Sequence, residues 1–410
     1  MSFINDPVNV ISAWIRSLLT GWRISESLTT VIIYFIGITS LIIFAMVLDI
    51  LLVWVERKVV ARFQDRLGPN RIGPFGLIQP FADIIKLIIK EDITPAGADK
   101  ILFNLGPILA ISSVIFLWAI LPLSDKIFGV DLNVAVLYLV AAGSIGTLSV
   151  ILGGWASNNK YALMGAYRMV ANMISYEIPM VIVLLIPTIL ADTMSVQGIT
   201  KAQSGVWFAI LSPLGLVIFL ISAIAELGRS PFDLNEAESE IVAGFHIEYT
   251  GMKFGLFYAG ELLHAFTFGG FIAVLFFGGY GGFFGLEKIS FFSWLNNPFV
   301  QMVVFLAKAM FGYWVIMWIK YSMPRIRIDH MLAFNWKFLT PLALVLLVTT
   351  AVLSKILSTL PAWEYAAGMF ASNMVIGIIT VEFLRKYGRK QRNVSNKNTS
   401  ANVQNQEQVV

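Results

Sequence analysis

Long apolar runs alternate with polar segments along the whole chain. A helix that crosses the hydrocarbon of a bilayer needs about 20 mostly apolar residues, because lipid offers the backbone no other hydrogen-bond partner. The pattern predicts an all-α polytopic membrane protein with about nine transmembrane helices, at 31–54, 101–121, 134–155, 174–191, 207–226, 255–277, 299–320, 339–357 and 366–384.

The composition supports a membrane protein, since 57% of the 410 residues are hydrophobic and 13% are charged. A soluble globular protein of this size needs more polar surface. Cytoplasmic loops carry the excess of Lys and Arg. Most of the 29 basic residues fall in four loops and the tail after residue 384, and the loops are 55–100, 156–173, 227–254 and 321–338. We therefore expect a multi-pass protein of the cell (inner) membrane, with its amino terminus outside and its carboxyl terminus cytoplasmic.

The runs also divide the chain into segments. Residues 1–30 form an outside amino-terminal segment without the features of a cleaved signal peptide, and 31–357 form the main membrane domain. An extra transmembrane helix is expected within 358–384. The polar tail, 385–410, has too few apolar residues to fold alone and is expected to be disordered.

Several kinds of chemistry are excluded. The chain has no cysteine, so it has no disulfide, no thiolate ligand for an iron–sulfur cluster and no cysteine nucleophile. Its three histidines, at 246, 264 and 330, match no metal-binding helix pattern, and no metal site is expected. No phosphate-binding or dinucleotide-binding glycine motif is present. The net charge of +4 is concentrated in the loops and tail, so we infer no nucleic-acid binding.

The first cytoplasmic loop, 56–100, is too long for a simple connector. Its first part predicts a helix lying along the lipid headgroups, because apolar and basic residues recur at helical spacing. The apolar residues are Val59, Val60, Phe63 and Leu67, and the basic residues are Arg57, Lys58, Arg62 and Arg66. Two Gly-Pro turns follow, at Gly68 and Gly73.

A second amphipathic surface helix is predicted at about 76–90. Asp83, Lys86 and Lys90 line one side of it, and isoleucines line the other. The two surface helices have two possible roles, which the residues leave open. They are either a structural pair, or they form an entrance for an amphiphile at the depth of the headgroups.

The stretch AELGRSPFDLNEAESE, 225–240, gathers five carboxylates and one arginine after an apolar run. Gly228 suits a helix C-cap. Ser230, Pro231 and Asp233 suit positions N-cap, N1 and N3 of a new helix. The segment is therefore predicted to be a helix break and restart at the inner membrane boundary.

Charge in this segment is unbalanced, because Arg229 can pair with only one or two of the acids. If the break is small, Glu226, Arg229 and Asp233 share one side, and Glu236, Glu238 and Glu240 remain in excess. Closely spaced carboxylates compete for protons and titrate as a coupled set. The segment could therefore hold and pass protons, and the alternative is a solvated acidic loop.

Further carboxylates lie within or at the ends of predicted spans: Asp49, Glu56, Glu177 and Glu261. A carboxylate at membrane depth is costly and by default suggests a function such as a proton path. Structural pairing with Lys308 or Arg168 is the alternative. His264, three residues after Glu261, could relay protons or could be a hydrogen-bonded core histidine.

Three long motifs resemble those of the quinone-site membrane subunit family of respiratory complex I, the proton-pumping NADH:quinone oxidoreductase. They are ERKVVARFQDRLGPNRIGPFGLIQPFADIIKLIIKED, MGAYRMVANMISYE and AELGRSPFDLNEAESEIVAGFHIEYTGMKFGLFYAGE. The resemblance covers roughly 30–355. Asn172, Gly228 and Leu262 depart from the family's common residues.

The resemblance implies that the chain forms the membrane part of a quinone chamber. Peripheral-arm subunits carrying the terminal iron–sulfur cluster would form its other wall. Quinone would be the substrate, and NADH, FMN and the iron–sulfur clusters would belong to partner subunits. Lipid and antiporter-like membrane subunits would be further neighbours.

The resemblance also implies two sets of site residues. The quinone-binding set is Glu56, Arg57, Arg66, Asp83, Glu91 and Arg229. The proton-coupling set is Glu177, Glu226, Asp233, Glu236, Glu238, Glu240, Glu248 and Glu261.

Two other functions remain as alternatives. The family has relatives in membrane-bound hydrogenases and other donor:quinone complexes, in which weaker acidic and Gly-Pro motifs are expected. A stand-alone ion transporter also fits nine helices and buried acids. It would work without partner subunits, and it does not explain the surface helices.

Overall fold

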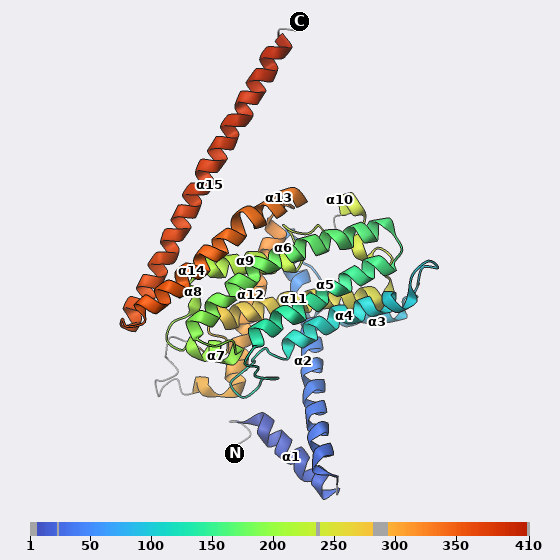
Figure 1. The fold of residues 1–410 in the computed structure, drawn as a ribbon. Coiled ribbons are helices and arrows are strands. Elements are labelled where there is room, and N and C mark those ends of the chain that lie inside the picture. Colours follow the sequence, from blue (N-terminus) through green and yellow to red (C-terminus); the bar gives the residue numbers. More distant parts are fainter. Residues whose placement is uncertain (1–5, 23, 235–237, 282–293, 408–410) are drawn as a thin grey trace.

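The structure is a computed structural model that describes residues 6–22, 24–234, 238–281 and 294–407, and these residues form helices and connecting loops without any strand (Figure 1). The predicted all-α polytopic class is confirmed, because eight described helices are long and apolar enough to cross a membrane. The elements are α1 (Pro7–Gly21), α2 (Glu26–Phe63), η1 (Pro74–Gly76), α3 (Gln79–Ile89), α4 (Lys100–Trp118), α5 (Ala135–Ala156), α6 (Lys160–Ala191), α7 (Val196–Ala202), α8 (Phe208–Leu211), α9 (Pro213–Glu226), α10 (Glu238–Ile241), η2 (Gly244–His246), α11 (Gly251–Phe276), α12 (Pro298–Ser322), α13 (Ile328–Phe334), η5 (Asn335–Leu339), α14 (Thr340–Leu357) and α15 (Ala362–Glu407).

Each predicted span has a helical counterpart, and the fifth corresponds to the shorter apolar helix α9. The predicted surface helix after the first span is wrong, because α2 continues through it as one helix of 38 residues. No proline interrupts this stretch. Such a helix is about 57 Å long at 1.5 Å per residue, so it exceeds a hydrocarbon layer of about 30 Å and carries its charged end beyond it. The second predicted surface helix is confirmed as α3.

Two helices extend away from the bundle (Figure 1). The amino-terminal half of α2 projects from it with α1 at its far end, and α15 projects elsewhere. α15 continues as helix to Glu407, although composition predicts a disordered tail after residue 384. A polar helix without packing partners is marginal in water, so disorder of 385–410 stays a prediction.

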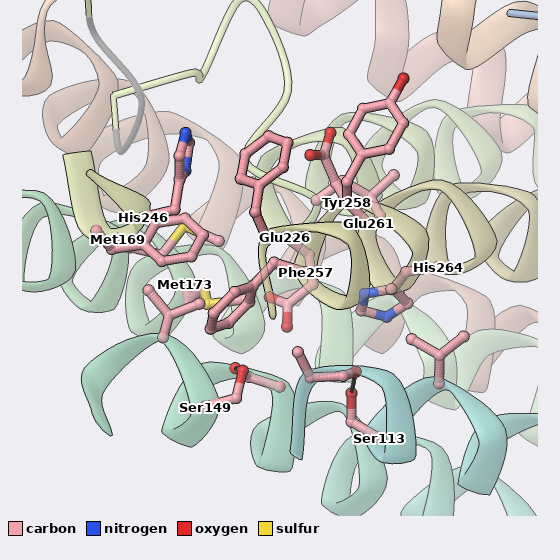
Figure 2. A pocket seen from close by; sticks show the side chains of 18 of the residues that line it. Ser113, Ser149, Met169, Met173, Glu226, His246, Phe257, Tyr258, Glu261 and His264 are labelled. Atoms are coloured by element: carbon pink, nitrogen blue, oxygen red, sulfur yellow. Dashed lines mark hydrogen bonds between the residues drawn. The ribbon is translucent and has the colours of Figure 1, made fainter. Parts of the chain in front are cut away.

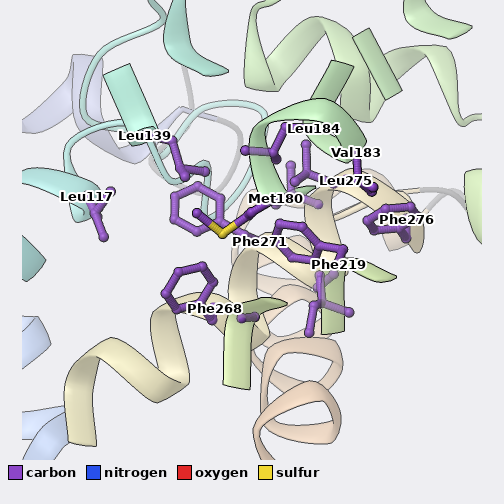
Figure 3. Close-up of a cluster of buried hydrophobic side chains, with 14 of the residues drawn as sticks. Leu117, Leu139, Met180, Val183, Leu184, Phe219, Phe268, Phe271, Leu275 and Phe276 are labelled. Carbon is purple, nitrogen blue, oxygen red and sulfur yellow. The ribbon is translucent and has the colours of Figure 1, made fainter. Parts of the chain in front are cut away.

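The packed interior centres on α11, whose side chains beyond Gly260 are all buried except Glu261. Around it, phenylalanines of α9 and α11 pack against aliphatic residues of α5 and α6 (Figure 3). Gly269 of α11 and Gly312 of α12 meet at a close helix crossing. A Cβ on Gly269 would come within 2.6 Å of the Ala309 carbonyl oxygen. Small residues allow such approach, and it fixes the cytoplasmic half of α12 beside Glu261.

The helix break after α9 is confirmed, and the restart at Ser230 is wrong. Gly228 has φ +60°, and the N–H groups of Gly228 and Arg229 donate to the carbonyls of Ala225 and Ile224, as in a Schellman motif. The chain then runs without helix to residue 234. Contacts with the α12–α13 connection hold it there, because the Ile326 N–H donates to the Pro231 carbonyl at 3.0 Å. These contacts outweigh the local capping signal.

Candidate functional site

A cluster of four charged side chains lies where α2, α11, α12 and the turn after α9 meet. Arg229 is 2% exposed, and its Nε donates to Oε1 of Glu261 at 3.0 Å. The other guanidinium face lies 3.9 Å from Oε2 of Glu56. Lys320 donates to Oε1 of Glu56 at 3.0 Å and lies 4.0 Å from Glu261. We call Glu56, Arg229, Glu261 and Lys320 the buried charge cluster.

Two tyrosines of α12 complete the surroundings of Glu56. The hydroxyl of Tyr313 donates to Oε2 at 3.2 Å, and the hydroxyl of Tyr321 donates to Oε1 at 2.5 Å. Both carboxylate oxygens therefore have donors, as an ionised buried carboxylate requires.

The charges balance within the cluster, which explains how an arginine can be buried there. Burial by itself would lower the pKa of the Arg229 guanidinium, but the carboxylates of Glu56 and Glu261 outweigh burial and raise that pKa above its usual value. Arg229 therefore stays charged. It bridges two carboxylates from helices far apart in the sequence.

A cavity of about 260 Å³ lies beside the buried charge cluster, and we call it the acid cavity. Glu226, Glu261, His264 and Lys320 line it. Figure 2 shows Glu226 and His264 toward the side formed by Ser113 and Ser149, with Glu261 across the pocket. Oε2 of Glu226 and Nε2 of His264 are both buried, and neither has a hydrogen-bond partner in the described part of the chain.

Two further cavities adjoin the cluster. The arginine cavity, about 360 Å³, is lined by Glu56, Arg57 and Arg66. The apolar cavity, about 400 Å³, lies between α2, α3 and α11 and is mostly lined by hydrophobic side chains. Tyr258 of α11 lines all three cavities, so its side chain is the common wall between them.

The structure brings together most of the residues predicted to bind quinone. Glu56, Arg57 and Arg66 line the arginine cavity. Arg57 pairs with Asp83 of α3, and this ion pair lies at the border of the apolar cavity. Glu91 is exposed and lines none of the three cavities described above.

The predicted proton-coupling residues divide into two groups. Glu226 and Glu261 face the acid cavity, and half-buried Glu177 of α6 lies close enough to Glu226 for the two carboxylates to repel each other. The other group lies in loops and pairs there. Asp233 accepts from Arg325 at 2.8 Å, Glu240 from Arg168 at 2.5 Å, and Glu248 from the Asn159 amide at 2.7 Å.

Two of the predicted residues are not placed in either group. Glu236 lies outside the described residues. Glu238 begins α10, and only its backbone is described. Arg229 pairs with none of the described acids of its own segment, contrary to the expectation that it shares a side with Glu226 and Asp233.

Sequence reasoning missed the contributions of α12 and Tyr258. Tyr313, Lys320 and Tyr321 lie at i, i+7 and i+8 and so share one helix face. That spacing was the available signal, but only packing shows that this face meets Glu56. Lys308, considered as a partner for the acids, instead donates to the carbonyls of Phe277 and Gly281 after α11.

Two titratable groups near the cavities complete the description. Asp49 of α2 lines the apolar cavity, and its buried Oδ1 has no hydrogen-bond partner among described atoms. Burial lowers the pKa of His246, which lines the acid cavity. Within the residues that the structure describes, no three His, Cys, Asp or Glu side chains are placed to hold a metal ion.

The helices and the buried charge cluster define a polytopic membrane protein with an ion-paired centre between its spans. Residues 13–351 match the family model described as NADH dehydrogenase, and the chain belongs to that family. The resemblance inferred from the motifs is thereby confirmed.

Curated relatives of the chain are named as the H-type membrane component of NADH-quinone oxidoreductase. The protein of Dehalococcoides mccartyi is 45% identical over 75% of this chain and 83% of its own length. The protein of Phocaeicola vulgatus is 40% identical over 84% of this chain and 97% of its own length. A protein of Geobacter metallireducens with the same name is 46% identical over 73% of this chain and 89% of its own length.

Proposed function

We propose that this chain is a membrane subunit of a proton-translocating NADH:quinone oxidoreductase. It forms the membrane wall of a quinone chamber and couples quinone reduction to proton transfer through buried carboxylates. The names of its relatives support the complex and the substrate. Peripheral subunits would close the chamber and hold NADH, FMN and the iron–sulfur clusters, and antiporter-like subunits would receive the coupling. The amino terminus would lie outside and the carboxyl terminus in the cytoplasm.

The observation that carries this proposal is the position of the buried charge cluster between the three cavities. The apolar cavity, between α2, α3 and α11, suits the tail of a lipid-soluble quinone. The arginine cavity offers Arg57 and Arg66 to its polar head. On the far side of Arg229 and Glu261 lies the acid cavity.

Coupling follows from the electrostatics of this arrangement. Reduction of a quinone takes up protons, and it changes the charge close to Glu56. Arg229 contacts both Glu56 and Glu261, so a change at one carboxylate alters the attraction available to the other. Glu261 then changes its protonation toward the acid cavity and Glu226. Each of these residues holds or moves a proton, and electrons reach the quinone from partner subunits.

The test uses Glu226→Gln and Glu261→Gln in the intact complex. Each change keeps the shape of the side chain and removes its proton-binding oxygen. We expect assembly to be retained, and NADH:quinone reductase activity or proton pumping in vesicles to fall by about 10²-fold. Glu382→Gln, an exposed acid on α15, is the matched control and should leave both rates unchanged. Wild-type rates in both variants would contradict the coupling role.

A purification experiment separates this function from the alternatives. The chain is isolated from membranes in mild detergent, and NADH:quinone reductase activity and iron–sulfur signals are measured in the same fraction. Co-purification of both supports the proposal. Recovery with a hydrogenase, or recovery alone with ion transport in vesicles, contradicts it.

A further inference from the structure

We propose that His264 is a proton-relay residue that exchanges protons with Glu226 through water held in the acid cavity. This inference rests on the proposed function and deepens it. His264 would act on the side of the cavity away from the buried charge cluster. It is a positioning residue, because it contacts neither the quinone nor an electron carrier.

The geometry places His264 on the path from Glu261. The two residues are three positions apart on α11, so both lie on one face of that helix. Both line the acid cavity, and Glu226 reaches the same cavity from the last turn of α9 (Figure 2). His264 is 9% exposed, and its ring packs against Phe268 with centroids 4.9 Å apart. This packing holds the ring in place while one edge faces the cavity.

Two orphaned polar atoms point to water in this cavity. Nε2 of His264 and Oε2 of Glu226 lack hydrogen-bond partners in the described ranges. Buried polar atoms are almost always hydrogen-bonded to protein or ordered water. The volume of about 260 Å³ has room for up to about eight waters at roughly 30 Å³ each. Water would therefore satisfy both atoms and connect them.

Serines extend the polar lining on the same side of the cavity. The hydroxyls of Ser113 and Ser149 donate to the carbonyls of Ala110 and Gly146 at 2.8 and 2.6 Å. Their remaining lone pairs can accept hydrogen bonds from water. A histidine packed only for structure would instead be expected to bond a fixed protein group.

The chemistry of imidazole suits a relay. Neutral imidazole has one nitrogen that donates and one that accepts. A proton taken up at one ring nitrogen can be matched by release of the proton at the other, so the ring returns to a neutral state with no net change. No bond other than N–H and O–H bonds forms or breaks.

The deciding variant is His264→Gln in the full complex. Its amide keeps a donor and an acceptor of similar reach, but it does not take up and release protons as imidazole does. We expect assembly and NADH oxidation by a hydrophilic artificial acceptor to be unchanged. Quinone reduction coupled to pumping should fall by about tenfold, below the 10² typical of a lost proton-transfer group because water bridges part of the gap. The solvent deuterium isotope effect should rise, because proton transfer becomes slower.

Phe268→Leu is the matched control, because it loosens the ring packing beside His264 and removes no proton-transfer group. It should leave the isotope effect at the wild-type value. Wild-type rates and a wild-type isotope effect in His264→Gln would overturn the relay. If Glu226→Gln and Glu261→Gln still lose coupling, only the role of His264 fails. If those two variants are also normal, the proposed function itself fails.

Discussion

The two ends of the acidic segment use carboxylates in different ways. Near its start, Arg229 has a side chain 1% exposed and bridges Glu56, 6% exposed, to Glu261. Farther along, Glu240 pairs with Arg168, and the glutamate side chain is 54% exposed. The residue types are the same, but a pair in water contributes little, whereas a buried charge without its partner is costly. Burial, and not the number of acids, decides which of them can control function.

The largest effect is expected from Arg229→Met. The change leaves Glu56 and Glu261 buried with one cation fewer, and removing one partner of a buried ion pair costs about 3–5 kcal/mol. We expect a lower unfolding temperature and loss of quinone reduction in the purified complex. Arg229→Lys is the control, since it keeps the charge and loses the two-sided geometry, so it should recover stability more than activity. An Arg229→Met complex as stable as wild type would break the comparison.

A smaller effect is expected from Tyr313→Phe, which removes one donor to Glu56 and keeps the ring. A hydrogen bond to a charged group contributes about 1.5–3 kcal/mol, and thermal unfolding of the complex measures the loss. Tyr365→Phe is the matched control, because its half-buried hydroxyl bonds only the neutral Ser354 hydroxyl, at 3.3 Å. Equal losses in the two variants would show that Glu56 is not held as an ion.

The smallest effect is expected from Asp233→Asn, which breaks the pair with Arg325 at the edge of the bundle. Partly exposed pairs contribute about 0–1 kcal/mol and are screened by salt. Unfolding temperature should change little, and any change should shrink as salt is added. A loss as large as that of Arg229→Met would mean that the two ends of the segment are equivalent.

The fold was predictable where a single helix carries the whole signal. Apolar length located every span, and the charged and isoleucine faces located α3. The errors arose where neighbouring segments compete. Pro231 suited a helix start, but its carbonyl bonds the Ile326 N–H, and the chain stays extended. The predicted break before the end of α2 failed because no proline or glycine is present there to stop the helix.

The candidate site was predictable in its acids and its arginine, because charged residues at membrane depth stand out from an apolar background. Tyr258 and Tyr313 did not stand out, since aromatic residues are common in membrane helices. Which acid Arg229 binds also could not be predicted. Its partners lie on α2 and α11, more than 30 residues away in either direction.

By itself, the sequence determined that the chain crosses a membrane, which segments do so, and which ionisable groups must be buried. These properties follow from hydrocarbon length and from the cost of charge in lipid, which act on each segment separately. Only the tertiary structure decided that Glu56, Arg229 and Glu261 form one cluster, and that Glu226 and His264 share a cavity. Such contacts depend on helix crossings, such as that of Gly269 with Gly312, whose geometry is set by the shapes of both partners at once.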